Sequence, residues 1–210
     1  NYDPFVQFSG AGWTFPEVGV FYGDYELTAS LVEDSTTNPE QPTNPGQPTT
    51  QPIFGSLEAD IIEVSGTSQL IFGGDSDDLI DASISSTGNN RIYGGSGDDT
   101  VILGMSDRIV GGAGADKFFT TDRGDNIITG GEGADQFWIA TAEIPEAANI
   151  ITDFTSGEDV LGIAGLGIGF DDLSITQEDD NTLIAANGSD LAILQGIGAE
   201  SLMVDNFAFV

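Results

Sequence analysis

Short alternations of apolar and polar residues recur between residues 55 and 138, and Gly- and Asp-rich segments separate them. In each alternation an apolar residue follows an Asp, Asn or Gln by two positions, as in DDTVI at 98–102 and ADQFW at 134–138. A period of two places neighbouring side chains on opposite faces of a strand, so we expect these apolar residues to point inward. Gly and Asp between the strands are typical of turns. The pattern therefore predicts an all-β chain of short strands joined by tight turns.

The turns and strands together form a nonapeptide repeat, Gly-Gly-x-Gly-x-Asp-x-apolar-x. The strong copies are GGDSDDLID at 73–81, where Ser76 replaces one Gly, GGSGDDTVI at 94–102, GGAGADKFF at 111–119 and GGEGADQFW at 130–138. A worn copy at 55–63 keeps Asp60 and Ile62. Weaker copies that keep the sixth and eighth positions lie at 64–72, 85–93, 102–110 and 121–129. The strong copies begin 21, 17 and 19 residues apart, which is close to two nonapeptides.

This spacing predicts a parallel β-roll in which two nonapeptides make one coil, with turns at both edges. Successive coils stack at about 4.8 Å, so the sixth-position Asp of one coil lies beside that of the next. Two carboxylates at this separation repel each other unless a cation lies between them. Calcium fits because it accepts about six to eight oxygens, including backbone carbonyls, in a flexible shell. Magnesium fits less well because it requires a tight octahedron.

These copies resemble the calcium-binding repeats of the RTX (repeats-in-toxin) family. The resemblance implies a right-handed parallel β-roll, calcium between coils, export by the type I secretion machinery, and folding on extracellular calcium. It also implies that the metal ligands are turn carbonyls and the sixth-position Asp side chains. Carried over to this sequence, the ligands are Asp60, Gly73, Gly74, Asp75, Ser76, Asp78, Gly94, Gly95, Ser96, Gly97, Asp99, Gly111, Gly112, Ala113, Gly114, Asp116, Gly130, Gly131, Glu132, Gly133 and Asp135.

The weaker copies depart from the family pattern, because their sixth positions are Gln69, Asn90, Asp107 and Asn126. We therefore expect a one-sided calcium ladder and an opposite edge held by amide hydrogen bonds. About three to four ions are expected, between residues 78/99, 99/116 and 116/135, with 60/78 as the fourth pair. Turn Asp residues can also cap backbone amides without metal, but four copies in register favour calcium. A phosphate-binding loop is excluded, because no helix follows and no Lys stands at the required position.

Four segments make up the predicted organisation. Residues 1–34 are a β segment with 8 of the 19 aromatic residues, either the tail of an upstream domain or a segment that docks on this chain or a neighbouring copy. Residues 35–52 are a Pro/Thr-rich linker with a period of three that suits polyproline II. Residues 53–148 form the β-roll, and residues 149–210 form a C-terminal β cap.

The cap begins with a worn repeat and then leaves the pattern. Asp153 and Asp159 lie in a segment that resembles the one closing RTX rolls, where they serve either as further calcium ligands or as turn residues. LSITQ, TLIAA and LAILQG are strand-like, and Asn187-Gly188 predicts a type I′ hairpin between the last two. The terminal DNFAFV resembles a type I secretion signal and is equally consistent with an edge strand.

Composition narrows the function. The chain holds 35 Asp plus Glu against 4 Lys plus Arg, a formal charge of −31, which argues against nucleic acid and anionic membranes as partners. It has no Cys and no His, and no apolar run long enough for a membrane helix. No catalytic constellation stands out, so we do not expect an enzyme. Because the chain begins with Asn1, we expect a piece or a processed product of a longer protein.

Three functions remain as hypotheses. The first is a calcium-binding module of a secreted, extracellular or cell-surface protein that folds on calcium and supports secretion, including the non-catalytic part of a larger hydrolase. The second is a structural subunit of a surface layer, fibril or adhesin that binds its own copies or cell-surface material. The third is a ligand-binding solenoid, such as an ice or glycan binder. We expect the third to need a regular outward row of Thr or aromatic residues, and the sequence indicates none.

Overall fold

The computed structural model describes residues 51–85 and 87–210. The expectations for residues 1–34 and for the linker up to residue 50 lie outside the described residues. Within the described ranges, the helices are three short 3-10 turns, at Phe170–Asp172 (η1), Ala199–Ser201 (η2) and Val204–Asn206 (η3). A search of the same ranges finds no helix of the length and apolarity that crossing a bilayer requires.

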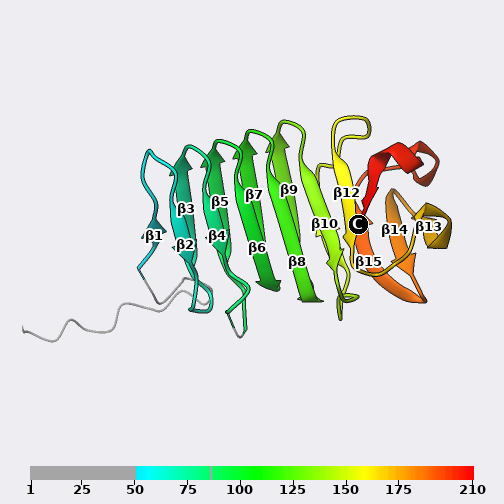
Figure 1. The fold of residues 1–210 in the computed structure, drawn as a ribbon, viewed down its shortest axis with the longest axis horizontal. Helices are drawn as coiled ribbons and strands as arrows, with labels where there is room; N and C mark the ends of the chain where they lie inside the picture. The colour runs from blue at the N-terminus through cyan, green and yellow to red at the C-terminus, as the bar shows by residue number, and fades with distance from the viewer. Residues whose placement is uncertain (1–50, 86) are drawn as a thin grey trace, which may run out of the picture. The chain divides into compact units, whose positions relative to one another are not determined.

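All other regular structure is β, in two sheets whose strands alternate along the chain as far as residue 164 (Figure 1). In spatial order, the nine-stranded sheet contains β1 Ile53–Phe54, β3 Leu70–Asp75, β5 Arg91–Ser96, β7 Arg108–Ala113, β9 Ile127–Glu132, β11 Asn149–Ile151, β15 Ser189–Leu194, β14 Asn181–Ala186 and β13 Leu173–Glu178. In the same way, the seven-stranded sheet contains β16 Phe207–Phe209, β12 Val160–Ala164, β10 Gln136–Thr141, β8 Lys117–Gly124, β6 Thr100–Met105, β4 Leu79–Asp81 and β2 Ile61–Glu63.

The strands from β1 to β12 form a parallel β-roll, as the repeats predict, but β11 and β12 extend it beyond the expected end at residue 148. Each odd-numbered strand turns into the next even-numbered strand, which lies in the other sheet, and every pairing among them is parallel. Parallel strands in one sheet need a crossover connection. Here the opposite sheet is that crossover, so each coil contributes one strand to each sheet.

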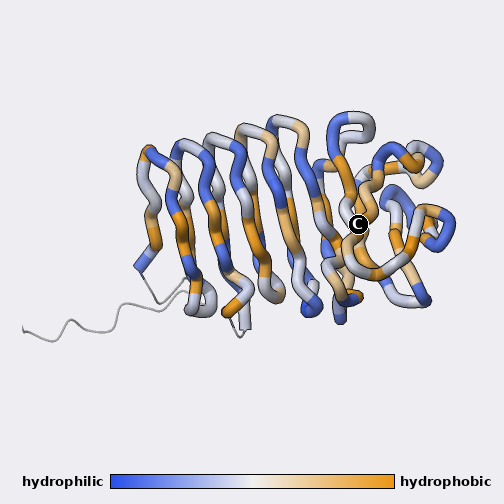
Figure 2. The backbone as a smooth tube through the Cα atoms, in the orientation of Figure 1, coloured by the Kyte–Doolittle hydropathy of each residue, from blue (hydrophilic) through white to orange (hydrophobic). Residues whose placement is uncertain are grey.

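The eighth position of every nonapeptide points into the roll. In the nine-stranded sheet it forms the column Ile71, Ile92, Ile109 and Ile128, and in the other sheet the column Ile80, Val101, Phe118 and Phe137, all at most 2% exposed. The Phe118 and Phe137 rings stack with centroids 5.3 Å apart. Burial of one such side chain contributes about 1.5–3 kcal/mol. Apolar strand segments alternate with hydrophilic turns along the coils in Figure 2.

The C-terminal cap contains the predicted hairpin. β14 and β15 pair antiparallel, and Asn187 and Gly188 connect them with φ of 52° and 80°. Positive φ at both residues is the requirement of a type I′ turn. The final strand, β16, pairs only with β12 and forms one edge of its sheet, which confirms the expected edge strand.

The expectation that no outward aromatic row exists is wrong. Phe54, Phe72 and Tyr93 are register partners on the outer face of the nine-stranded sheet, and their rings stack at 5.2 and 5.1 Å. Phe119 and Trp138 stack at 5.8 Å on the other sheet. Most of these residues occupy the ninth position of a copy, which the repeat leaves undefined. They become neighbours only when the coils stack, so the nonapeptide pattern does not reveal them.

The two faces of β7 give a direct test of this packing. Ile109→Ala should lower the free energy of unfolding by about 2–5 kcal/mol, because it leaves a cavity in the core column. Val110→Ala, at a side chain that is 38% exposed, should cost less than about 1 kcal/mol. Denaturant unfolding in saturating calcium measures both, and equal losses would contradict the assigned inward and outward faces.

Candidate calcium sites

The strong turns lie between the odd-numbered strands and the even-numbered strands that follow them, along one edge of the roll (Figure 1). Their second Gly adopts a φ between 115° and 128°, as at Gly95 (126°) and Gly131 (115°). A Cβ on Gly112 would strike the Gly95 carbonyl oxygen of the preceding coil, so the turns can stack only as glycine. Ser76 is tolerated at the fourth position because its φ is 72°, in the left-handed region that other residues can enter.

The sixth-position Asp side chains form a continuous ladder across these turns. One oxygen, Oδ1, of each Asp accepts a hydrogen bond from the backbone N–H of the corresponding Asp in the preceding coil. The bonds are Asp60 N to Asp78 at 2.8 Å, Asp78 N to Asp99 at 2.8 Å, Asp99 N to Asp116 at 2.8 Å, Asp116 N to Asp135 at 2.9 Å, and Asp135 N to Asp159 at 2.9 Å. The repeat spacing therefore places the predicted Asp residues in one row.

The second oxygen of the central Asp residues has no hydrogen-bond donor. Oδ2 of Asp78, Asp99 and Asp116 is buried and unpartnered among the described residues. Buried polar atoms are normally hydrogen-bonded, so each of these three oxygens needs an explanation. A carboxylate oxygen that is buried from water and has no hydrogen-bond donor is suited to bind a cation.

Carbonyl oxygens of the neighbouring coil converge on the same points. A Cβ placed on Gly73 would meet both Asp78 Oδ2 and the carbonyl oxygen of Gly94. A Cβ on Gly94 would likewise meet Asp99 Oδ2 and the carbonyl oxygen of Gly111. The same arrangement recurs one coil further, at Gly111, with Asp116 Oδ2 and the Gly130 carbonyl. Two hard acceptors beside each glycine, with no donor between them, fit calcium.

No group of three or more Asp or Glu carboxylates converges within the described part of the chain. A cation between two coils would therefore take most of its ligands from backbone carbonyls. Some predicted carbonyls already accept one bond, since Ala113 O receives Gly97 N–H and Glu132 O receives Gly114 N–H, both at 2.8 Å. A carbonyl oxygen has two lone pairs, so these bonds leave one acceptor direction free.

Burial raises the pKa of every central ladder Asp. Desolvation is the largest cause, and it brings the pKa of Asp99 and of Asp135 to about 6 and that of Asp116 to about 7. The backbone N–H of the preceding coil partly offsets the effect, while the neighbouring ladder carboxylates raise the pKa further. The pKa of Asp78 is also raised by burial. Desolvation and the neighbouring carboxylates both penalise the charged form, as expected for carboxylates stacked without a counter-ion.

The two ends of the ladder use protein donors. Asp60 Oδ2 accepts the backbone N–H of Ser56 at 2.6 Å, and Asp159 Oδ2 accepts that of Thr155 at 2.7 Å. Asp153 accepts the N–H groups of Gly130 and Gly131 at 2.9 and 3.0 Å. The sequence leaves Asp153 and Asp159 either as further calcium ligands or as turn residues. Their bonds to backbone N–H groups are those expected of turn residues. Asp60 lies at the expected end of the ladder, and its Oδ2 is already paired with the Ser56 N–H.

The opposite edge is a second ladder, and it is closed by hydrogen bonds as expected. The bonds are Gln69 N to Asn90 Oδ1 at 3.0 Å, Asn90 N to Asp107 Oδ1 at 2.8 Å, Asp107 N to Asn126 Oδ1 at 2.8 Å, and Asn126 N to Asn149 Oδ1 at 3.2 Å. The remaining oxygen of Asp107 accepts the backbone N–H of Gly104 at 3.0 Å. This edge therefore leaves no carboxylate oxygen of Asp107 without a donor.

Sequence reasoning missed a third row, at the fifth position of the strong copies. Asp77 accepts the N–H of Asp98 at 2.8 Å, and Asp98 accepts the N–H of Ala115 at 2.8 Å. Both side chains are exposed, so this row ties the turns together on the solvent side. The Asp-Asp pairs at 77–78 and 98–99 were the available signal.

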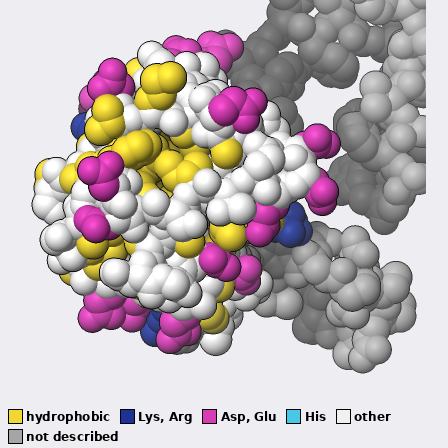
Figure 3. All heavy atoms as spheres, turned by 90° about the vertical axis from the view of Figure 1, so that its right-hand side faces the viewer, with side chains coloured by type: hydrophobic (Ala, Val, Ile, Leu, Met, Phe, Trp, Pro, Cys, Tyr) yellow, Lys and Arg dark blue, Asp and Glu magenta, His cyan; other side chains and the backbone are white. Residues whose placement is uncertain are grey.

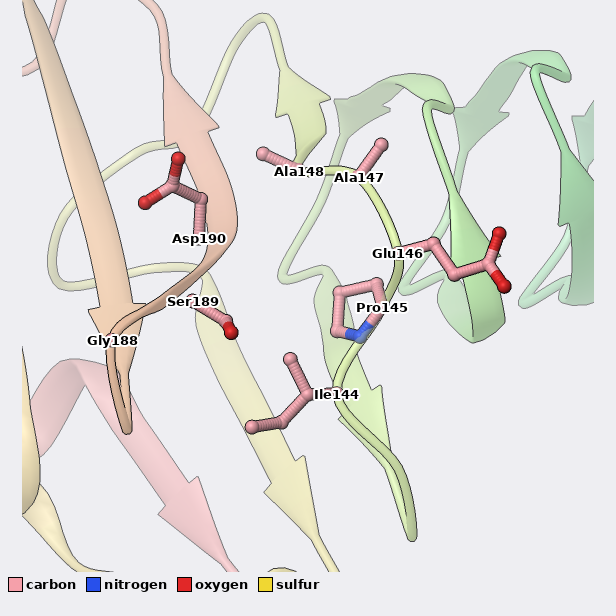
Figure 4. A pocket seen from close by; sticks show the side chains of 8 residues that line it. All are labelled: Ile144, Pro145, Glu146, Ala147, Ala148, Gly188, Ser189 and Asp190. Carbon is pink, nitrogen blue, oxygen red and sulfur yellow. The ribbon is translucent and has the colours of Figure 1, made fainter.

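Two hollows in the C-terminal part of the described chain lie away from the Asp ladder. Between the 144–148 loop and the β14–β15 turn, Glu146 points away from Asp190, so these carboxylates do not form a joint site (Figure 4). On the C-terminal end, hydrophobic side chains gather with Asp and Glu around them (Figure 3). A shallow pocket there is lined by residues that include Phe170, Leu202, Met203 and Val204.

The stacked Gly- and Asp-rich turns place this protein in the class of β-solenoids that is typical of calcium-binding β-rolls. The family model described as RTX calcium-binding nonapeptide repeat matches residues 83–105 and 118–138, in four copies. The coils of this region therefore consist of RTX repeats, as the resemblance predicts. No match was found among the curated proteins.

Solved structures similar to the chain include two subunits of the Azotobacter vinelandii mannuronan C5-epimerase. AlgE6R3 is 24% identical, covering 80% of this chain and 86% of that one, with a TM-score of 0.34. AlgE6R2 is 24% identical, covering 80% and 96%, with a TM-score of 0.38. The extracellular lipase LipA from Serratia marcescens is 15% identical, covering 77% and 40%, with a TM-score of 0.33.

The raised pKa values predict how acid affects the calcium-free protein. An unfolded Asp has a pKa near 3.9, whereas in the fold the pKa of Asp99 and Asp135 is about 6 and that of Asp116 about 7. Protonation therefore stabilises the fold: the contribution is present below about pH 4 and is lost as pH rises through about 6 to 7. In calcium-free buffer, β-structure measured by far-UV circular dichroism should resist denaturant better at pH 5 than at pH 8.

Asp116→Asn is the matched variant for this experiment. A neutral amide of the same shape removes one titrating carboxylate from the ladder. The calcium-free variant should therefore be more stable than the parent at pH 8 and should depend less on pH. Higher stability of the parent at pH 8 than at pH 5 would show that the ladder carboxylates do not limit the calcium-free fold.

Proposed function

We propose that this chain is a calcium-dependent folding module of a secreted or cell-surface protein, and that calcium between the coils completes its β-roll. The observation that carries the proposal is the row of buried Oδ2 atoms without donors on Asp78, Asp99 and Asp116. The match to RTX calcium-binding nonapeptide repeats over residues 83–105 and 118–138 supports the choice of ion.

The proposed ligands are the sixth-position Asp side chains and the turn carbonyls that the family resemblance implies. Three sites are favoured, between residues 78/99, 99/116 and 116/135, because each pairs an unpartnered Oδ2 with a carbonyl of the next coil. A fourth site at 60/78 has weaker support, since Asp60 Oδ2 already accepts the Ser56 N–H. When bound, calcium supplies positive charge and a flexible oxygen-accepting shell.

Calcium binding and folding are coupled in this proposal. The Asp residues of one site belong to different coils, so the site exists only when the coils stack. An ion that binds the folded state alone stabilises it by mass action. A formal charge of −31 adds self-repulsion that the calcium-free compact state must overcome. The chain therefore stays unfolded where calcium is scarce and folds in extracellular calcium, which suits type I secretion.

A structural role in assembly is the second candidate. Phe54, Leu57 and Ile61 in the first coil are 69%, 75% and 78% exposed. Strands β1 and β2 are edge strands of their sheets, and edge strands offer unpaired backbone groups to another chain. This end of the roll therefore favours growth by addition of a strand from another copy.

A calcium titration of metal-stripped protein tests the proposed ladder. The β signal in circular dichroism should appear cooperatively near millimolar calcium. Asp99→Asn should raise the calcium midpoint several-fold and reduce cooperativity, because Asp99 faces two sites. Asp107→Asn, at the equivalent position of the opposite edge, should change the midpoint much less. Equal shifts for the two variants would refute the one-sided ladder, and a metal-stripped protein that is already folded and indifferent to calcium would refute the proposal.

Light scattering through the same titration separates the two candidates. A monomeric mass at saturating calcium is expected for a folding module. Growth of particle mass at the folding midpoint, suppressed by Ile61→Lys on the exposed edge strand β2, would support assembly instead. Lys117→Glu, which changes charge away from that edge, is the control.

A further inference from the structure

The outer face of the nine-stranded sheet carries a shallow hollow at β5, β7 and β9. It is lined by Arg91, Tyr93, Arg108, Val110, Ile127 and Thr129, with Ile92 and Ile109 below, and has a volume of about 310 Å³. None of these residues belongs to the Asp ladder. The calcium-dependent module proposed above leaves this hollow without a role.

The hollow begins where the aromatic stack ends. Phe54, Phe72 and Tyr93 lie in register on successive coils, with interplanar angles of 8° and 13° between neighbouring rings. The next residue in this row is Val110, followed by Thr129. Phe72 covers one face of the Tyr93 ring. On the side of the other face, the next residues of the row, Val110 and Thr129, have smaller side chains. A flat ring placed over Val110 would continue the stack.

Two arginines stand beside this position. Arg91 and Arg108 are register partners on adjacent parallel strands, about 4.8 Å apart, and both are exposed. Among the described residues, neither has an ion pair with Asp or Glu. Like charges side by side on a sheet are destabilising. In a chain with 35 acidic residues and 4 basic ones, an Arg pair without a carboxylate points to an external anion.

We infer that this hollow binds a ring that carries a carboxylate, and that its ligand is an acidic saccharide. The sugar ring lies over Val110 against the free face of Tyr93, and its carboxylate meets the guanidinium groups of Arg91 and Arg108. Guanidinium matches a carboxylate with two parallel N–H donors.

A saccharide fits this face better than an acidic peptide. Peptide strands bind at sheet edges through backbone hydrogen bonds. On the face of a sheet those backbone groups are already used in the strand ladder, as in the β5–β7–β9 pairing. What remains for a ligand is one ring face, two guanidinium groups, the Tyr93 hydroxyl and aliphatic side chains. These groups recognise a ring with hydroxyls and a carboxylate.

Calorimetric titration of the full chain in millimolar calcium tests the inference. The probe is a short galacturonate oligosaccharide, dialysed against the same calcium buffer. A neutral glucose oligosaccharide of equal length provides rings without carboxylates, and an oligoglutamate peptide provides carboxylates without rings. The galacturonate should bind at least about tenfold more tightly than either control, because only it engages both Tyr93 and the Arg pair.

Three variants locate the site. The double variant Arg91→Gln/Arg108→Gln should weaken galacturonate binding about tenfold or more, because it removes the charge-assisted bonds. Val110→Phe should abolish binding while keeping the fold, since its ring occupies the ligand position on Tyr93. Lys117→Gln removes one positive charge on the other sheet and should leave binding unchanged. Circular dichroism of each variant checks that the roll is intact.

Several results would overturn the inference. Oligoglutamate binding as tightly as galacturonate would show a general anion or peptide surface. Full affinity in Val110→Phe would place the ligand elsewhere, and no binding by the folded parent would remove the site. Because the roll is verified separately in calcium, none of these results bears on the proposed folding function.

Discussion

The structure depends on one repulsion, that between the carboxylates stacked along one edge of the roll. Neighbouring coils are about 4.8 Å apart, and like charges at that distance cost roughly 1–3 kcal/mol per pair in water-exposed to partly buried settings. The hydrogen bonds to Oδ1 fix each Asp in place, and they hold Oδ2 inside the turn beside a carbonyl of the next coil. The backbone thus arranges the acceptors but supplies no positive charge. Protons or a bound cation must provide it before the coils can stack at low cost.

The two edges of the roll divide this problem between them. On the edge with Asn90, Asp107 and Asn126, amide oxygens perform the same bridging with little charge, and both oxygens of Asp107 have backbone donors. Among the described residues, the buried atoms without a partner on that edge are the amide nitrogens of Asn90 and Asn149, which are donors and do not attract a cation. The apolar columns inside the roll are continuous from coil to coil, so they favour stacking in every condition. Burial also raises the pKa of Asp107 on the edge with Asn90, but only the Asp edge stacks buried carboxylates directly on one another, so the repulsion between coils is concentrated there.

Much of this architecture is predictable from sequence because the repeat defines it locally. The first Gly, the sixth-position Asp and the eighth-position apolar residue each have a role within one coil. A single copy such as 111–119 therefore specifies a turn, a ladder Asp and a core side chain. The outward row of Phe72 and Tyr93, and the bond from Asp98 to Asp77, depend instead on coil spacings of 21 and 17 residues that differ from 18. Their register is set by loop length in the weak turns, so it emerges only when the coils are stacked. The bonds from Asp153 to Gly130 and Gly131 likewise join segments that no repeat relates.

The placement of the few cations follows from the same geometry. A Lys or Arg could neutralise the ladder only from within the turns, where a Cβ on Gly73, Gly94 or Gly111 would already strike a carboxylate oxygen and a carbonyl oxygen. No side chain fits there, whereas an ion needs no covalent attachment and can enter from solvent. The neutralising charge must then come from protons or from a dissolved cation. The arginines of β5 and β7 stand outside, on the face of the sheet, where their charge is available to a partner and not to the ladder. Because these two arginines lie outside the turns, they do not neutralise the buried Oδ2 atoms of the ladder.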